Sequence, residues 1–186
     1  MLLSKQNLVS KTFMFKTKNN AEETSDKRLE VSIESNKTEP AKVFNRIETF
    51  STNYTYTKFP ELINSTPASD EECFEMEEFI THYNDLWIKL VNNKDLSIVQ
   101  YVRGNSGPRK DIDKYYNDNN ITENLDLFEV HDVRKFGNYY YIWTHEKITK
   151  YSLYKTEYKE HHWIYKVAED SDGHYVETYI PDPYYK

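Results

Sequence analysis

The hydrophobic pattern of the chain changes its period once, near residue 121, and this change constrains the fold more than any other feature. Between residues 69 and 116 apolar side chains recur at every third or fourth position, which is typical of helices. From Ile121 onward apolar and polar residues alternate, which is typical of strands. Helices that precede a run of consecutive strands indicate an α+β domain with an antiparallel sheet.

The longest predicted helix begins at residue 69. Ser69 and Glu72 have the spacing of a capping box, in which a hydroxyl and a carboxylate satisfy free backbone N–H groups. One face of this helix then carries apolar residues over several turns: Met76, Phe79, Ile80, Tyr83, Trp87, Leu90 and Val91. Asp95 predicts the start of a second, shorter helix that ends at Gly104, and Pro108 predicts the first turn of a third.

Four strands are predicted after the helices, over residues 125–135, 139–151, 153–167 and 175–180. If the second and third strands pair through a tight turn near Ser152, Trp143 lies beside His161 and His145 lies beside Lys159. Strands of this length generally twist and curl, so that the sheet can wrap around a helix. The expected architecture is three helices packed on a long curled antiparallel sheet.

The pattern specifies the first 66 residues poorly. Residues 12–16, 29–33, 43–50 and 53–57 favour strands, but each is too short to be stable alone. Pro60 and residues 64–69 are typical of a linker. We therefore expect an extension over residues 1–66, either a flexible arm or the remnant of a preceding small β domain, and one α+β domain over residues 67–183.

Charge and composition exclude several classes of function. The formal charge of −7 divides into +2 over residues 1–68 and −9 over residues 69–186, and an acidic domain is a poor partner for nucleic acid. The single cysteine, Cys73, excludes an internal disulfide and a thiolate zinc site. No segment approaches the roughly 20 apolar residues of a membrane span, and the first residues lack the apolar core of a signal peptide.

The order of these elements resembles the nuclear-transport-factor-2-like (NTF2-like) fold, a cone-shaped α+β arrangement. In detail the sequence resembles the C-terminal domain of TcaA-type proteins, which sit in the envelope of Gram-positive bacteria. The resemblance covers roughly residues 75–182 and rests on core and cap positions: Phe79-Ile80 with Tyr83 and Trp87, Asn93-Lys94-Asp95-Leu96-Ser97, Tyr101-Val102-Arg103-Gly104-Asn105-Ser106, Asn120-Ile121-Thr122-Glu123-Asn124-Leu125, Phe128-Glu129-Val130 and Tyr141-Ile142-Trp143-Thr144-His145-Glu146.

The resemblance implies a place on the extracytoplasmic face of the cell membrane and a link to cell-wall antibiotic response, and it names no catalytic residue. That family usually carries an N-terminal zinc ribbon with paired cysteines, then a transmembrane helix, then small β domains. This sequence shows neither the ribbon nor the span. We therefore expect either the C-terminal part of such a protein or a relative without the anchor.

Folds of this kind can hold a pocket between the helices and the concave face of the sheet. The side chains predicted to line it are rings and imidazoles: Tyr83, Trp87, Tyr115, Tyr141, Trp143, His145, His161 and Trp163. Two interpretations stay open, because bulky rings can line a ligand site or fill the space completely. The resemblance adds that related enzymes use an Asp or His there for isomerase or dehydratase chemistry; Glu146 comes nearest to a general base here.

The sequence contains no clear metal site. Adjacent residues in a strand point to opposite faces, so His131-Asp132 and His145-Glu146 are not ready dyads. Convergence of His145 and His161 with a carboxylate is the nearest approach to the three or four ligands that a metal needs. We predict no metal, no cofactor and no catalytic residue.

These observations lead to two hypotheses of function. The first is a non-enzymatic accessory or binding module of the cell envelope, whose partner is a cell-wall polymer or an envelope protein. The alternative is a small-molecule enzyme or ligand receptor that uses the pocket, with Glu146, His145 and His161 as its candidate residues.

Overall fold

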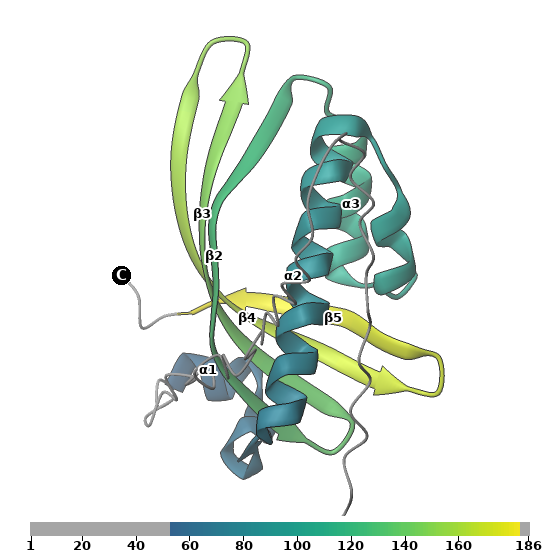
Figure 1. Cartoon of the computed structure of the whole chain (residues 1–186), viewed down its shortest axis with the longest axis vertical. Coiled ribbons are helices and arrows are strands. Elements are labelled where there is room, and N and C mark those ends of the chain that lie inside the picture. The colour runs from purple at the N-terminus through teal and green to yellow at the C-terminus, as the bar shows by residue number, and fades with distance from the viewer. Residues whose placement is uncertain (1–52, 183–186) are drawn as a thin grey trace, which may run out of the picture. The chain divides into compact units, whose positions relative to one another are not determined.

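The strands form one antiparallel meander in the order β1-β2-β3-β4-β5, in a computed structural model that describes residues 53–182 (Figure 1). Its helical elements are α1 (Asn53–Lys58), the 3-10 helix η1 (Pro60–Asn64), α2 (Asp70–Asn93), the 3-10 helix η2 (Ser97–Tyr101) and α3 (Gly107–Tyr116). Its strands are β1 (Thr66–Pro67), β2 (Ile121–Phe136), β3 (Tyr139–Ser152), β4 (Thr156–Asp170) and β5 (Gly173–Pro181). The predicted α+β architecture is confirmed. The strands predicted over residues 12–16, 29–33 and 43–50 lie outside the described residues.

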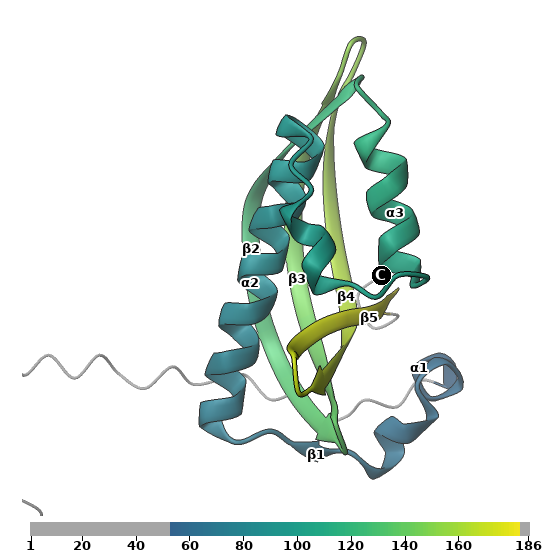
Figure 2. The same ribbon diagram turned by 90° about the vertical axis from the view of Figure 1, so that its right-hand side faces the viewer.

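The sheet curls because its strands are long and irregularly paired. An extra residue interrupts the pairing of β2 with β3 between Leu125 and Leu127 and again between Val130 and Asp132. A third irregularity lies where β4 meets β5, at Lys166 and Val167. A bulge bends its strand and increases the local twist, so these positions close the sheet around the helices that lie against its concave face (Figures 1 and 2).

Helices α2 and α3 lie on this concave face, which we call the inner face (Figure 2). The main core is formed there by apolar side chains that include Ile80, Ile98, Ile112, Ile142, Val167 and Val176. The second predicted helix is a single 3-10 segment, η2, preceded by Asp95, whose carboxylate accepts hydrogen bonds from the backbone and hydroxyl of Ser97. Among the described residues, no helix is long and apolar enough to cross a membrane.

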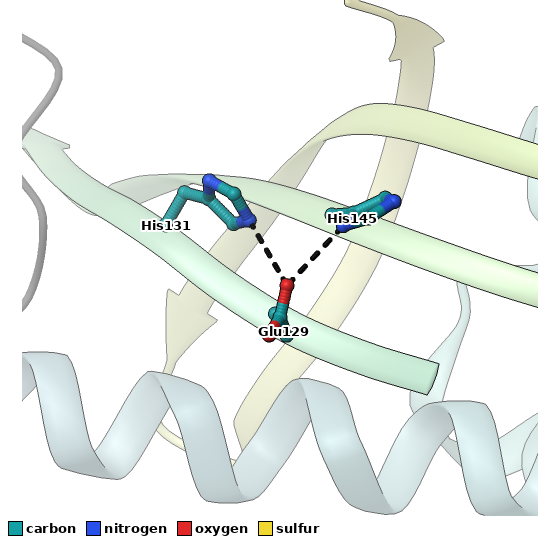
Figure 3. Close-up of side chains that lie close together, drawn as sticks. All are labelled: Glu129, His131 and His145. Carbon is teal, nitrogen blue, oxygen red and sulfur yellow. Dashed lines mark hydrogen bonds and ion pairs between the residues drawn. The ribbon is translucent and has the colours of Figure 1, made fainter. Parts of the chain in front are cut away.

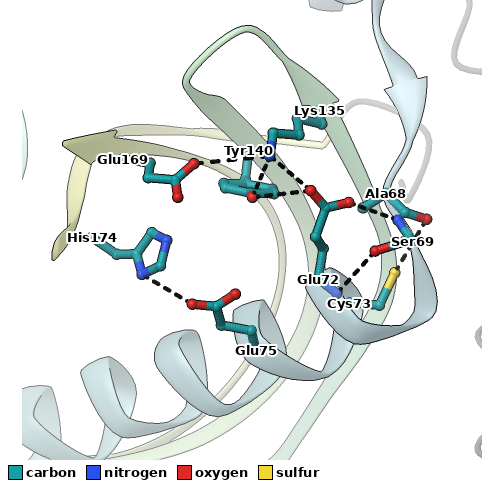
Figure 4. A network of polar contacts seen from close by, with 9 residues as sticks. All are labelled: Ala68, Ser69, Glu72, Cys73, Glu75, Lys135, Tyr140, Glu169 and His174. Carbon is teal, nitrogen blue, oxygen red and sulfur yellow. Dashed lines mark hydrogen bonds and ion pairs between the residues drawn. The ribbon is translucent and has the colours of Figure 1, made fainter. Parts of the chain in front are cut away.

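The start of α2 is held by the capping box that the sequence predicts (Figure 4). The Ser69 hydroxyl accepts from the backbone N–H of Glu72, and the Glu72 carboxylate accepts from the backbone N–H of Ser69. Lys135 of β2 donates to the same carboxylate over 2.7 Å and to the Tyr140 hydroxyl over 2.7 Å. The hydrogen bonds from Lys135 and Ser69 lower the pKa of Glu72 to about 2. This network fastens the first turn of α2 to the β2–β3 hairpin.

The far end of α2 is fastened to the sheet by one amide side chain. Asn92 donates to the backbone carbonyl of Glu123 and accepts from the backbone N–H of Glu123, each over 2.8 Å. Lys94 follows in the left-handed conformation that ends the helix, and its ammonium donates to the carbonyls of Tyr115 and Asp118 at the end of α3. These contacts fix the separation between the helices and the sheet.

The segment before β1, including α1 and η1, is packed against the opposite, convex side of the sheet, which we call the outer face. Phe59 and Leu62 are buried there with Tyr141, Trp143 and Ile164. The expected strand at 53–57 is wrong, because this segment forms α1, and the expected linker contains η1 and β1. Alternating Tyr and Thr residues favour a strand only where a neighbouring edge is free to pair with them, and here burial of the adjacent Phe59 decides the conformation.

Candidate functional site: a pocket between the helices and the sheet

A cavity of about 360 Å³ lies between α2, α3 and the inner face of β3, β4 and β5, and we call it the helix–sheet pocket. Its volume falls in the range of small-ligand sites. The lining residues alternate rings with polar groups: Tyr83, Asn84, Trp87, Asp111, Lys114, Tyr115, Glu123, Glu146, Ile148, His161, Trp163, Tyr165 and Tyr179. The rings therefore line a space and do not fill it.

Glu146 is the most perturbed carboxyl group of the pocket. Only 2% of this residue is exposed, and burial raises its pKa to about 7, although hydrogen bonds from Tyr165 and Thr144 oppose the shift. The Tyr165 hydroxyl donates to Oε1 over 2.9 Å, and the Thr144 hydroxyl donates to the same atom over 3.1 Å. Glu146 therefore exchanges a proton near neutral pH, inside a wall of rings.

Two further carboxylates are positioned by ring donors. The indole Nε1 of Trp87 donates to Oε2 of Glu123 over 3.2 Å. Lys150 lies 3.6 Å from the other oxygen of that carboxylate. The Tyr179 hydroxyl donates to Asp111 of α3. Because each acid is tied to a ring, the aromatic and polar parts of the wall keep a fixed relation to each other.

Tyr83 has a buried hydroxyl that is not satisfied by the protein. The residue is only 2% exposed, and its hydroxyl has no hydrogen-bond partner among the described residues. Burial and the nearby charges of Asp111 and Glu146 raise its pKa, so it stays protonated and able to donate. A buried hydroxyl without a partner costs about 1–3 kcal/mol, which an acceptor within hydrogen-bonding reach would recover.

Four rings on β4 and β5 form one continuous aromatic wall. Tyr165 and Tyr179 are cross-strand neighbours whose ring centroids lie 5.5 Å apart. Trp163 meets Tyr179 edge to face at 5.3 Å, and it stacks on His161 at 5.4 Å. Burial lowers the pKa of His161, so its imidazole is neutral at physiological pH. The wall therefore offers flat faces bordered by hydrogen-bonding atoms.

The structure brings together five of the eight residues predicted to line the pocket: Tyr83, Trp87, Tyr115, His161 and Trp163. The other three lie on the outer face. Tyr141 and Trp143 are buried beneath Phe59 and Leu62, and His145 lies between Glu129 and Glu160. Glu146, the candidate base, lies in the pocket, whereas His145, its proposed companion, does not.

The expected pairing of β3 with β4 is wrong by three residues. Trp143 faces Ile164 and not His161, and His145 faces His162 and not Lys159. Because side chains alternate along a strand, a shift by an odd number exchanges the two faces of the sheet. This exchange explains why His145 and His161 do not converge.

Sequence reasoning missed Asp111, Glu123 and Tyr179. Tyr179 could have been found from the alternation of the last strand, which places it on the face of the other inward rings once the register is known. Asp111 precedes the buried Ile112 on α3, and Glu123 precedes the alternating part of β2, so neither carries a periodic signal. Their role emerges only from the packing of α2 and α3 on the sheet.

Helices on the concave face of a curled antiparallel meander, with a pocket between the two layers, define the NTF2-like class of α+β domains. Within this class, the sequence model of the TcaA protein NTF2-like domain matches residues 74–180, more than half of the chain. The chain therefore belongs to the family of TcaA protein NTF2-like domains. Comparison with curated proteins gave no match.

Proposed function

We propose that this chain is a non-enzymatic binding domain of a TcaA-type protein at the extracytoplasmic face of the cell membrane, and that the helix–sheet pocket binds a sugar unit of a cell-wall polymer. Membership of the TcaA NTF2-like family supports the cellular setting. The pocket supports the binding role, and the observation that carries it is the combination of open ring faces with ring-anchored carboxylates.

Sugars have two kinds of surface, and the pocket offers a match for each. Their C–H faces stack on aromatic rings, and Trp163, Tyr115 and Trp87 present rings to the cavity. Their hydroxyl groups donate to carboxylates and accept from tyrosine hydroxyls, as Glu123 and Tyr83 allow.

The charged residues that line the helix–sheet pocket indicate which sugars can bind there. Among the described residues that line the pocket, the acids Asp111, Glu123 and Glu146 outnumber one lysine, Lys114, and a second lysine, Lys150, lies 3.6 Å from Glu123. An acidic wall repels the phosphate groups of an anionic polymer and tolerates neutral or amino sugars. The favoured ligand is therefore a sugar unit without phosphate groups.

Replacement of Tyr83 by phenylalanine tests the ligand role of its hydroxyl. Because the buried hydroxyl has no partner in the described structure, its removal should stabilise the free protein by about 1 kcal/mol in urea unfolding. The same change should weaken binding of wall fragments, because the donor is lost. Tyr165→Phe is the matched comparison: its hydroxyl donates to Glu146, so its removal should destabilise the protein.

Retention on purified cell walls tests the proposed function. The wild-type chain should sediment with walls whether or not their anionic polymers have been removed. Trp163→Ala should reduce retention at least about fivefold, since a stacked ring contributes about 1 kcal/mol. Tyr154→Ala is the matched control, because this ring is 96% exposed at the β3–β4 turn and remote from the pocket lining. Absence of wild-type retention, or equal retention of Trp163→Ala, would contradict the proposal.

A second candidate function rests on Glu146. A buried carboxyl group with a pKa of about 7 beside tyrosine hydroxyls is the arrangement of a general acid or base, as in an isomerase or dehydratase. Glu146→Gln separates the two functions. It keeps the shape and the acceptor oxygen, so a binding domain should retain its ligand, whereas an acid–base enzyme should lose turnover.

A further inference from the structure

A row of side chains crosses the outer face of the sheet, on the side away from the helix–sheet pocket. Glu129 of β2, His145 of β3 and His162 of β4 are successive cross-strand partners. His131 and Glu160 lie two positions from Glu129 and His162, along the same strands. The ligand atoms of two groups within this set converge to within 4.8 Å: Glu129 with His131 and His145, and His145 with Glu160 and His162.

The β2 bulge accounts for the first group. Val130 pairs with Thr144 and Asp132 pairs with Trp143, so His131 is the extra residue between them. It can therefore turn toward Glu129, and its Nε2 lies 3.7 Å from Oε2 of that carboxylate (Figure 3). On the other side, Nδ1 of His145 lies 3.2 Å from the same oxygen (Figure 3).

The hydrogen bond of His145 to Glu160 makes the contact of its Nδ1 with Glu129 unusual. Its Nε2 lies 2.7 Å from Oε1 of Glu160, a distance at which the ring N–H donates to the carboxylate. A neutral imidazole has only one N–H, so its Nδ1 then presents a lone pair to the Glu129 oxygen. Two acceptors face each other at 3.2 Å, an arrangement that a cation between them, or a second ring proton, would make favourable.

We propose that Glu129, His131 and His145 bind a zinc ion. Zinc bonds of about 2.0–2.1 Å in tetrahedral geometry place neighbouring ligand atoms about 3.3 Å apart, close to the observed separations of 3.2 and 3.7 Å. Two imidazoles and one carboxylate form a three-ligand set that leaves a coordination position open for water or another oxygen donor.

The surroundings of His145 favour this group of ligands over the second. Histidines that bind a metal commonly donate their other N–H to a carboxylate, which is the role that Glu160 takes here. The ring of His162 lies parallel to that of His145, at 4.3 Å and 6°, so their lone pairs run side by side. The ring of His131 is turned by 80° to that of His145, so their lone pairs can meet at one point.

The position is accessible to an ion in solution. The side chain of Glu129 is 52% exposed and that of His131 is 26% exposed. His145 is more enclosed, which holds its ring in place between the two carboxylates. The site lies on the outer face, on the opposite side of the sheet from the helix–sheet pocket.

Zinc and cobalt titrations of the untagged full chain test the site. One equivalent of Zn²⁺ should bind in calorimetry and raise the melting temperature. Co²⁺ should give the intense visible absorption of a site with four or five ligands. Glu129→Gln and His131→Gln should each weaken binding at least about tenfold, and Glu160→Gln should weaken it about tenfold while the cobalt spectrum is kept. His82→Gln, which removes an exposed histidine of α2, should change affinity less than about twofold.

Three outcomes would overturn the assignment. The first is the absence of saturable binding of either ion. The second is binding that Glu129→Gln and His131→Gln do not affect. The third is a loss of binding in His162→Gln together with unchanged binding in His131→Gln, which would place the ion in the second group. Circular dichroism of each variant reports whether the sheet is intact.

Discussion

Replacement of Phe59 by alanine is expected to lower the free energy of unfolding by about 3–4 kcal/mol. Phe59 is buried on the outer face of the sheet and meets the Tyr141 ring edge to face at 5.3 Å. Truncation of a buried phenylalanine removes its transfer free energy and leaves a cavity, which together cost about 3–5 kcal/mol. Urea unfolding followed by circular dichroism measures the change.

The cavity that Phe59→Ala would leave cannot close easily, because polar contacts hold the residues around Phe59 against the sheet. Glu61 accepts from the Tyr141 hydroxyl over 2.5 Å and from Lys166 over 2.8 Å. Arg134 donates to the hydroxyl and the carbonyl of Ser65, each over 2.8 Å. Ile63→Ala is the matched control, because Ile63 is 70% exposed in the same segment and its truncation should cost little. If Phe59→Ala lowers the free energy of unfolding as little as Ile63→Ala does, Phe59 is not packed against the sheet.

Replacement of Glu146 by glutamine is expected to remove a loss of stability that the wild type suffers as pH rises. The carboxyl has a pKa of about 7 in the folded protein and an ordinary value of 4.5. The folded state therefore binds this proton more tightly than the unfolded state, so its stabilisation is complete below pH 4.5 and declines through pH 7. Between pH 5 and pH 8 the decline amounts to about 2.5 kcal/mol.

The effect is measured as the change, between pH 5 and pH 8, in the free energy of unfolding of Glu146→Gln relative to the wild type. Glutamine is neutral throughout and keeps an oxygen that accepts from Tyr165 and Thr144. The stability of Glu146→Gln relative to the wild type should therefore rise by about 2.5 kcal/mol from pH 5 to pH 8 in urea unfolding. Glu78→Gln, at an exposed position of α2, is the matched control for the loss of one carboxyl group. A flat difference for Glu146→Gln would mean that the carboxyl is solvated.

The elements that carry their own chemistry were predictable from sequence. The capping box at Ser69 and the start of α3 near Pro108 each rest on a residue type with a specific backbone or hydrogen-bonding role. The inward rings of α2, such as Tyr83 and Trp87, follow from helical period alone. The part of the pocket wall that α2 supplies was therefore predictable, because it belongs to one helix.

The part of the wall that β4 supplies depends on the β3–β4 turn. Ser152 and Lys155 are joined by reciprocal backbone hydrogen bonds, so Leu153 and Tyr154 form the turn. Neither is Gly, Asn or Asp, the residues that mark a tight hairpin in sequence. An unmarked turn leaves the register open, and the resulting shift of three positions decides that His161 lies in the pocket and His145 on the outer face.

The helical conformation of residues 53–57 could not be predicted from sequence for a different reason. Thr55 is buried and its carbonyl accepts the backbone N–H of Phe59, which closes the last turn of α1. The local pattern of 53–57 favours a strand, and its conformation is decided by contacts with β3 and β4, more than 75 residues away in the chain.

The indole resonances of the three tryptophans test the central claim, that the helix–sheet pocket binds the ligand. Trp87 and Trp163 line the pocket, and Trp143 is buried on the opposite face of the sheet. Titration of the ¹⁵N-labelled full chain with a soluble disaccharide fragment of wall glycan should shift the Trp87 and Trp163 indole signals in a saturable manner and leave that of Trp143 in place. Single Trp→Phe variants assign the three signals. Absence of saturable shifts, or shifts confined to Trp143, would contradict the account.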